Sequence, residues 1–155
     1  MKILQSLTFA ENSKLVYVDF RIKSDYLDPE IISAELGVLP TSAFAKGEKY
    51  ESRARDPATD TIIKRWLYHP WGVWHFETKS LGSNKKVQEH LTFLLTTLEP
   101  RRKSIEKYLA DEKNYSISIY IWYEPHDGHG SYEIPRELIC RAASLCHYME
   151  FGFVS

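Results

Sequence analysis

Two imidazoles and one carboxylate lie within four residues of a glycine-containing turn, at His126, Asp127 and His129. Such donors can hold zinc or another divalent cation. A structural zinc site needs a fourth ligand, however, and no further Cys or His lies nearby in the sequence. Aspartates in turns also accept backbone hydrogen bonds. We therefore expect a turn without metal or cofactor, and keep a metal-dependent enzyme or small-molecule-binding module centred on these residues as the alternative.

Other catalytic signatures are weak in this chain. His75 and Glu77 lie on one side of a predicted strand, where His75 could act as a general base, but a solvent-facing strand produces the same pair. No Gly-x-Ser-x-Gly motif occurs. Cys140 and Cys146 fall in one predicted helix, too far apart for a disulfide, and we expect buried thiols. The sequence thus predicts a protein that is not an enzyme.

Basic residues alternate with aromatic ones in a central segment that includes Arg53, Arg55, Arg65 and Trp66. This pattern suits nucleic acid, yet acidic residues are interleaved and the net charge is -1. We therefore expect neither a nucleic-acid nor a membrane partner. No run of about 18 apolar residues occurs, and we expect no cleavable signal peptide. Because we expect both cysteines to be free thiols, we predict a cytoplasmic location.

Aromatic side chains indicate a binding surface more clearly than the basic residues do. Tyr120 and Trp122 share the side of a predicted strand opposite its isoleucines, and Trp71 precedes another strand. Exposed Tyr and Trp on a rigid sheet are good contact anchors, unless a second layer or the long loop covers them. The residues that we predict to bind a partner are Arg53, Arg55, Arg65, Trp66, Trp71, Tyr120, Trp122, His126, Asp127 and His129.

Period-two and helical patterns define the elements that would carry these residues. Strands are predicted over 3–9, 14–23, 71–79, 115–123 and 149–154. Helices are predicted over 28–36, from 82 to a kink or new helix at Pro100, and from Pro135. Residues 62–68 fit a strand or a short helix, and residues 41–65 show little periodicity.

The alternating strands and interleaved helices predict a single α+β domain over residues 1–155. We expect a mainly antiparallel sheet of four to six strands with helices packed on one face. A ferredoxin-like core with a long inserted loop, residues 42–65, fits this order of elements.

Several short motifs together resemble a known family over nearly the whole chain. They are Asp28-Pro29-Glu30, Leu36 to Thr41, Lys46-Gly47, Trp74, Leu94-Leu95, Leu98-Glu99-Pro100, Gly128 to Gly130 and Ile134 to Leu138. In order and spacing they resemble the bacterial domain of unknown function 4279 (DUF4279). The resemblance implies no catalytic residues, and small bacterial families of this type often serve as immunity partners of secreted toxins.

We therefore predict a non-enzymatic protein-binding domain, an immunity protein that neutralises a bacterial toxin by occluding it. The predicted contact surface is the loop 42–65, Trp71 and the turn 124–132. The near-neutral net charge disfavours a highly basic nuclease as the partner. A small-molecule sensor with a pocket under the long loop is a further alternative, and the sequence leaves the oligomeric state open.

Overall fold

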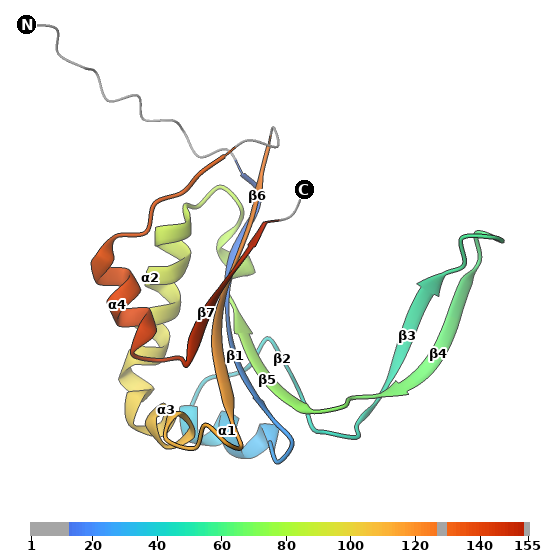
Figure 1. Cartoon of the computed structure of the whole chain (residues 1–155), viewed down its shortest axis with the longest axis horizontal. Helices are drawn as coiled ribbons and strands as arrows, with labels where there is room; N and C mark the ends of the chain where they lie inside the picture. Colours follow the sequence, from blue (N-terminus) through green and yellow to red (C-terminus); the bar gives the residue numbers. More distant parts are fainter. Residues whose placement is uncertain (1–12, 127–129, 154–155) are drawn as a thin grey trace, which may run out of the picture.

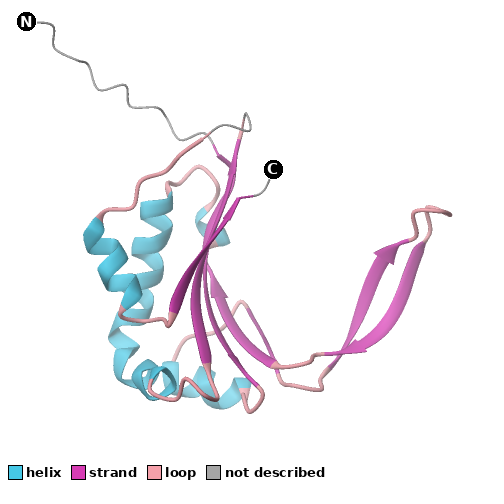
Figure 2. Cartoon of the chain, viewed as in Figure 1, coloured by secondary structure: helices cyan, strands magenta, loops and turns pink. Residues whose placement is uncertain are grey.

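A five-stranded sheet with helices on one side and a separate two-stranded ribbon make up the fold (Figures 1 and 2). The computed structural model describes residues 13–126 and 130–153. The strand predicted over 3–9, together with Asp127 and His129, lies outside the described residues. None of the helices in the described ranges is long and apolar enough to cross a membrane.

The elements follow one another along the chain with short connections. They are β1 (Ser13–Ser24), α1 (Pro29–Leu36), β2 (Ser42–Phe44), β3 (Lys49–Arg55), β4 (Ile62–Tyr68), β5 (Gly72–Glu77), α2 (Val87–Leu98), α3 (Arg102–Leu109), β6 (Ser116–Pro125), α4 (Arg136–Ala143) and β7 (Tyr148–Phe153). Two 3-10 turns, η1 (Lys79–Leu81) and η2 (Glu99–Arg101), flank α2. The new helix predicted at Pro100 is therefore confirmed.

The sheet has the strand order β2-β5-β1-β6-β7. Three of its pairings are antiparallel, whereas β6 and β7 run parallel because α4 crosses over between them. The α+β class and the helices on one face are confirmed (Figure 2). The ferredoxin-like core stays a prediction, since this strand order does not confirm it.

Helix α1 begins and ends where its sequence predicts. The Asp28 side chain accepts hydrogen bonds from the backbone N–H groups of Glu30 and Ile31. Pro29 occupies the first turn, where its missing N–H leaves no bond unmade. Gly37 ends the helix with a φ of 58°, a conformation that other residues adopt only with strain.

The core lies between the helices and the face of the sheet that they cover. Trp74 is fully buried there, and its Nε1–H donates to Ser33 Oγ at 3.0 Å. The apolar residues around it come from alternate positions of β1 and β6 and from one side of α2: Val16, Val18, Phe20, Ile22, Ile117, Ile119, Ile121, Leu91, Leu94, Leu95 and Leu98. Of the two free cysteines, Cys146 is buried as predicted, whereas Cys140 is exposed because it faces away from the core.

One buried polar network ties α2 to the sheet. The Val18 N–H donates to Thr78 Oγ1 at 2.9 Å, and this hydroxyl contacts His90 Nδ1 at 2.7 Å. The other ring nitrogen, Nε2, lies 3.1 Å from the carbonyl oxygen of Gly82. These contacts fit a neutral imidazole that donates from Nε2, and burial lowers the pKa of His90.

The prediction of a long loop over residues 42–65 is wrong, because most of these residues form strands. Residues 49–68 fold into a two-stranded antiparallel ribbon, here called the arm, in which Lys49 lies opposite Tyr68 and Arg55 opposite Ile62. The arm extends away from the rest of the molecule (Figure 1). Both of its sides meet solvent, so its strands lack the apolar-polar alternation that marks a half-buried strand.

Candidate functional site

Among the described residues, no helix lies against one face of the five-stranded sheet, and we call this the open face (Figure 2). Alternate residues of adjacent strands meet there because side chains point to opposite sides with a period of two. Across the sheet, Glu77, Asp19 and Tyr120 form one row, and His75, Arg21 and Ser118 form the next. Tyr17 and Trp122 lie directly opposite each other beside these rows.

Three aromatic rings on this face stack side by side. The ring centroids of Tyr17 and Trp122 are 5.8 Å apart, and those of Trp122 and Tyr120 are 4.3 Å apart. Gly152 on β7 makes room for Tyr120, because a Cβ at this position would lie 2.6 Å from the tyrosine ring. The predicted contact residues Tyr120 and Trp122 are thus brought together.

Charged side chains form a cluster beside the aromatic rings. Arg21 Nη2 lies 2.5 Å from Asp19 Oδ2, and His75 Nε2 lies 3.4 Å from both Asp19 Oδ1 and Glu77 Oε2. Lys79 Nζ lies 3.3 Å from Glu77 Oε2 and 4.4 Å from the ring centroid of Tyr17. The cluster therefore places basic and acidic side chains next to one another on one face.

Burial changes the protonation of this cluster. Asp19 is 1% exposed, and its burial raises the pKa of the carboxyl group, although the charges of His75 and Arg21 act in the opposite direction. Burial, reinforced by the charges of Glu77 and Asp19, raises the pKa of Tyr17 to about 12. Asp19 is thus held in a setting that disfavours its charged form.

Three buried polar atoms on the open face have no hydrogen-bond partner among the described residues: Asp19 Oδ1, His75 Nε2 and Trp122 Nε1. The contact of 3.4 Å between the first two lacks the geometry of a hydrogen bond. Unsatisfied buried polar groups are rare in folded proteins and destabilise them. Within residues 13–126 and 130–153, no group of three or more His, Cys, Asp or Glu side chains could hold a metal ion.

Three of the predicted binding residues lie on the same side of the arm, and a fourth lies on the opposite side. Arg53, Arg55 and Trp66 lie on one side, with Tyr68 next to Trp66, whereas Arg65 lies on the other side. Trp66 is 60% exposed and Tyr68 is 65% exposed. The Nζ atom of Lys49 lies 4.7 Å from the ring centroid of Trp66. This side of the arm is therefore aromatic and basic.

A ring stack connects the arm to the open face. His69 stacks on Phe44 with 3.5 Å between ring centroids and on Tyr50 with 4.3 Å. Phe44 lies opposite Val73 in the sheet, on the same side as His75. Tyr50 belongs to the side of the arm that also carries Arg65 and Leu67. The stack therefore joins this side of the arm to the open face at the edge of the sheet.

Trp71 lies just before β5, next to Lys23 on the open-face side of β1, whereas the predicted His-Asp-His turn begins just after β6. The Trp71 ring has Lys23 Nζ 3.4 Å from its centroid and lines a cavity of about 320 Å³ that also includes Tyr26 and Tyr115. His126 is exposed beyond the end of β6, while Asp127 and His129 lie outside the described residues. A metal at this turn is therefore neither supported nor contradicted.

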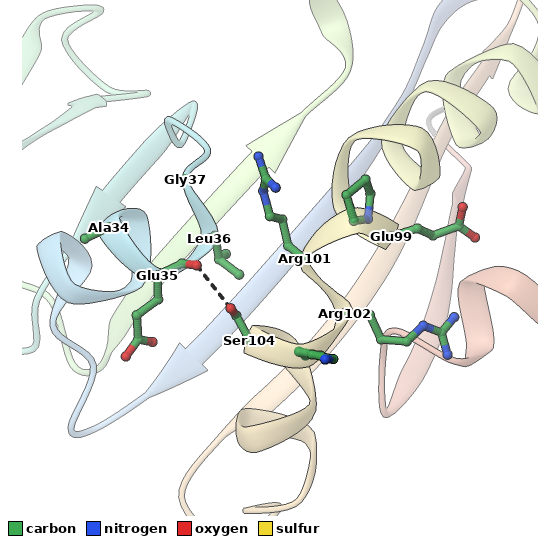
Figure 3. A pocket seen from close by; sticks show the side chains of 10 residues that line it. Ala34, Glu35, Leu36, Gly37, Glu99, Arg101, Arg102 and Ser104 are labelled. Carbon is green, nitrogen blue, oxygen red and sulfur yellow. Dashed lines mark hydrogen bonds between the residues drawn. The ribbon is translucent and has the colours of Figure 1, made fainter.

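A larger cavity of about 530 Å³ lies between the end of α1 and the start of α3 (Figure 3). Its two acidic residues are already paired, Glu99 with Arg141 at 2.8 Å and Glu35 with Lys107 and Tyr108. Ser104 donates a hydrogen bond to the Glu35 carbonyl oxygen, and the Arg101 guanidinium lies beside Gly37 (Figure 3). A cation next to the last carbonyls of a helix stabilises it, so these contacts have a structural explanation.

Sequence reasoning missed Asp19 and Arg21 as members of the site. Their signal was the charged side of the strand predicted over 14–23, where Asp19, Arg21 and Lys23 alternate with apolar residues. Asp19 is buried because Tyr120 and Glu77 flank it from neighbouring strands, and pairing of this kind is not visible in a single strand.

Comparison with known proteins identifies the family but not the activity. Neither the curated proteins nor the solved structures gave a match to this chain. The family described as "Domain of unknown function (DUF4279)" matches residues 14–151, which includes every described strand and helix apart from the ends of β1 and β7. The resemblance in the short motifs is thereby confirmed, and the chain belongs to the DUF4279 family.

Proposed function

We propose that this chain is a non-enzymatic protein-binding domain whose partner lies against the arm and the open face. The observation that carries the proposal is the arm itself. A lone two-stranded ribbon is only marginally stable in water. Nevertheless, this one presents Trp66 and Tyr68 to solvent, together with Ile62 at its far end. A partner that covers these side chains would bury apolar surface and order the ribbon.

The open face supports the same proposal. Trp122 and Tyr120 are partly exposed, and aromatic anchors of this type dominate the energy of protein interfaces. The orphaned polar atoms of Asp19, His75 and Trp122 would gain hydrogen bonds if their neighbours shifted against a polar partner surface.

Charge gives the expected character of the partner. Residues 49–68 contain five basic and three acidic side chains in a chain that is otherwise slightly acidic. Complementary charge steers association, so the surface that meets the arm should be acidic rather than basic. This favours an acidic protein and disfavours a basic nuclease.

The specific form of the function that we propose is immunity, in which the domain occludes a bacterial toxin. Its support is the association of small bacterial families with this role, together with the shape of a projecting arm that can enter a cleft. No cofactor is needed, because occlusion is steric and electrostatic.

The test is co-expression with the protein encoded by the adjacent reading frame, read as growth rescue and co-purification. A variant in which Asn-Gly replaces residues 51–66 shortens the arm, because Tyr50 and Leu67 lie opposite each other and a two-residue turn can join them. We expect rescue by the wild type and none by this variant.

Point variants make the test independent of the deletion. Trp66→Ser with Tyr68→Ser should weaken binding by about 30-fold or more, as expected for a hot spot. Leu39→Ser is the matched control, because Leu39 is 85% exposed and lies outside both the arm and the sheet. Full rescue by the arm variants, or no complex with the wild type, would contradict the proposal.

A further inference from the structure

Like the arm, the outer edge of β7 is a surface without a partner in the described part of the chain. Strands β2 and β7 form the two edges of the five-stranded sheet. β2 has three residues, whereas β7 has six and pairs only with β6 in the described part of the chain. The other edge of β7 therefore presents a row of backbone N–H and C=O groups available for another strand.

This edge lacks the features with which proteins usually prevent strand addition. Its sequence, Tyr148 to Phe153, contains no Lys and no Pro, and its register with β6 is continuous. The two strands of the arm also have free edges, but they carry Lys49, Arg53 and Arg55 on one strand and Lys64 and Arg65 on the other. β7 is thus the least protected edge among the described strands.

Apolar side chains follow the same edge. Phe151 lies beside Ile121 and Phe153 beside Tyr123, so both point to the side of the sheet that the helices cover. Phe151 is nevertheless 51% exposed and Phe153 66% exposed. The helices therefore do not reach this rim, and two large rings remain uncovered next to a free strand edge.

We propose that β7 pairs in antiparallel fashion with β7 of a second copy, about a two-fold axis at Phe151. In this register Phe151 faces Phe151 of the second copy, and Met149 faces Phe153. All these side chains are apolar and lie on the helix side of the sheet. Cross-strand pairs of this kind stabilise antiparallel sheets.

Charge is compatible with this register and with a second copy as the occupant. The only charged side chain of β7, Glu150, lies opposite Gly152 of the second copy, where there is no side chain to repel it. Centring the axis on Glu150 instead would put two carboxylates directly opposite each other, which is unfavourable. The strand is therefore complementary to itself, as a two-fold interface requires.

Pairing of this kind has a consequence for the open face. A two-fold axis between antiparallel strands stands perpendicular to the sheet, so both open faces lie on the same side. Two five-stranded sheets become one continuous sheet, and the dimer carries two arms. A partner with two equivalent sites would then be held at both.

The first test is the mass of the full chain in solution by sedimentation velocity, from about 1 to 100 µM, the range of moderate affinities. We expect twice the single-chain mass of 18.1 kDa. Phe151→Lys places a charge on the axis and should raise the dissociation constant at least about 100-fold. Leu39→Lys, an equally drastic change at a site 85% exposed, should leave the mass unchanged.

The second test reads the register directly. In a Cys140→Ser background, Phe151→Cys places two thiols opposite each other at a separation that a disulfide can span with a small shift. Mild oxidation should give a covalent dimer, while Leu39→Cys in the same background should not.

A single-chain mass at every concentration would overturn the proposal, and so would equal cross-linking by Leu39→Cys or a dimer that persists in Phe151→Lys. The outer edge of β7 is separate from the arm. A monomer that still binds a foreign protein through Trp66 would therefore contradict this inference alone and leave the proposed function standing.

Discussion

The two faces of the five-stranded sheet carry the same kinds of side chain, but the polar atoms of these side chains differ in their hydrogen bonding. On the helix-covered face, Trp74 is fully buried and its indole N–H donates to Ser33. On the open face, the buried indole nitrogen of Trp122 has no hydrogen-bond partner among the described residues. The indole N–H of Trp74 therefore has a hydrogen-bond acceptor within the chain, whereas that of Trp122 has none among the described residues.

The same contrast holds for titratable groups. His90, packed between α2 and the sheet, has both ring nitrogens in polar contacts at 2.7 and 3.1 Å. Asp19, on the open face, has one oxygen paired with Arg21 and one orphaned. The polar groups of the covered face therefore have their partners within the chain, whereas polar atoms of the open face lack them among the described residues.

The largest expected effect separates the two tryptophans. Trp74→Ala should reduce the free energy of unfolding by about 3–5 kcal/mol, because it leaves a cavity in the core and orphans Ser33. Trp122→Ala should cost about 1 kcal/mol, since the removed ring is partly exposed and its nitrogen is already unsatisfied. Urea denaturation of both variants measures these losses of unfolding free energy. Losses of similar size would contradict the difference that we infer between the two faces.

An effect of intermediate size should appear in the dependence of stability on pH. Because burial lowers the pKa of His90, the folded state prefers the neutral ring. The stability that this network contributes is present above the unfolded pKa of about 6.5 and is lost as pH falls through the lower folded value. The contribution of His90 to the unfolding free energy should therefore decrease between pH 7.5 and pH 5.5, whereas the buried Asp19 carboxyl contributes a change of opposite sign.

His90→Gln should be less stable at pH 7.5 but should flatten that decrease, because glutamine does not titrate. His126→Gln, at an exposed position, is the matched control and should keep the wild-type slope. An unchanged slope in the first variant would show that the network contributes no pH dependence.

Local signals in the sequence were sufficient for the elements that form the covered face. Asp28 and Gly37 mark the ends of α1, and the alternation of Ile117, Ile119 and Ile121 marks β6. These signals arise because one side of each element is buried by the chain itself. Where that condition fails, as in the arm, the alternation disappears, so β3 was predicted as part of a loop and β4 as either a strand or a short helix.

The candidate site was only partly predictable for a related reason. The common face of Tyr120 and Trp122 follows from strand periodicity, so their pairing could be predicted. The separation of Arg65 from Arg53 and Arg55 depends on the register of the arm, and the burial of Asp19 depends on its neighbours in β5 and β6. Registers between strands are set by the whole sheet and leave little trace in a single segment.

The smallest expected effect is on stability at Asp19, and its sign is the most informative. Burial raises the folded pKa of this carboxyl above its unfolded value, so its charge at neutral pH works against folding, and this disadvantage disappears as pH falls. Asn resembles the protonated form. Asp19→Asn should therefore increase the free energy of unfolding at pH 7, and it should weaken the binding that we propose for the open face. Glu77→Gln, on the same face, breaks the contact with Lys79 and should slightly destabilise the protein.

If thermal unfolding shows both variants equally destabilised, the pair of Asp19 and Arg21 stabilises the fold as the covered face does. A more stable Asp19→Asn would instead mean that the open face retains a group whose value lies in binding.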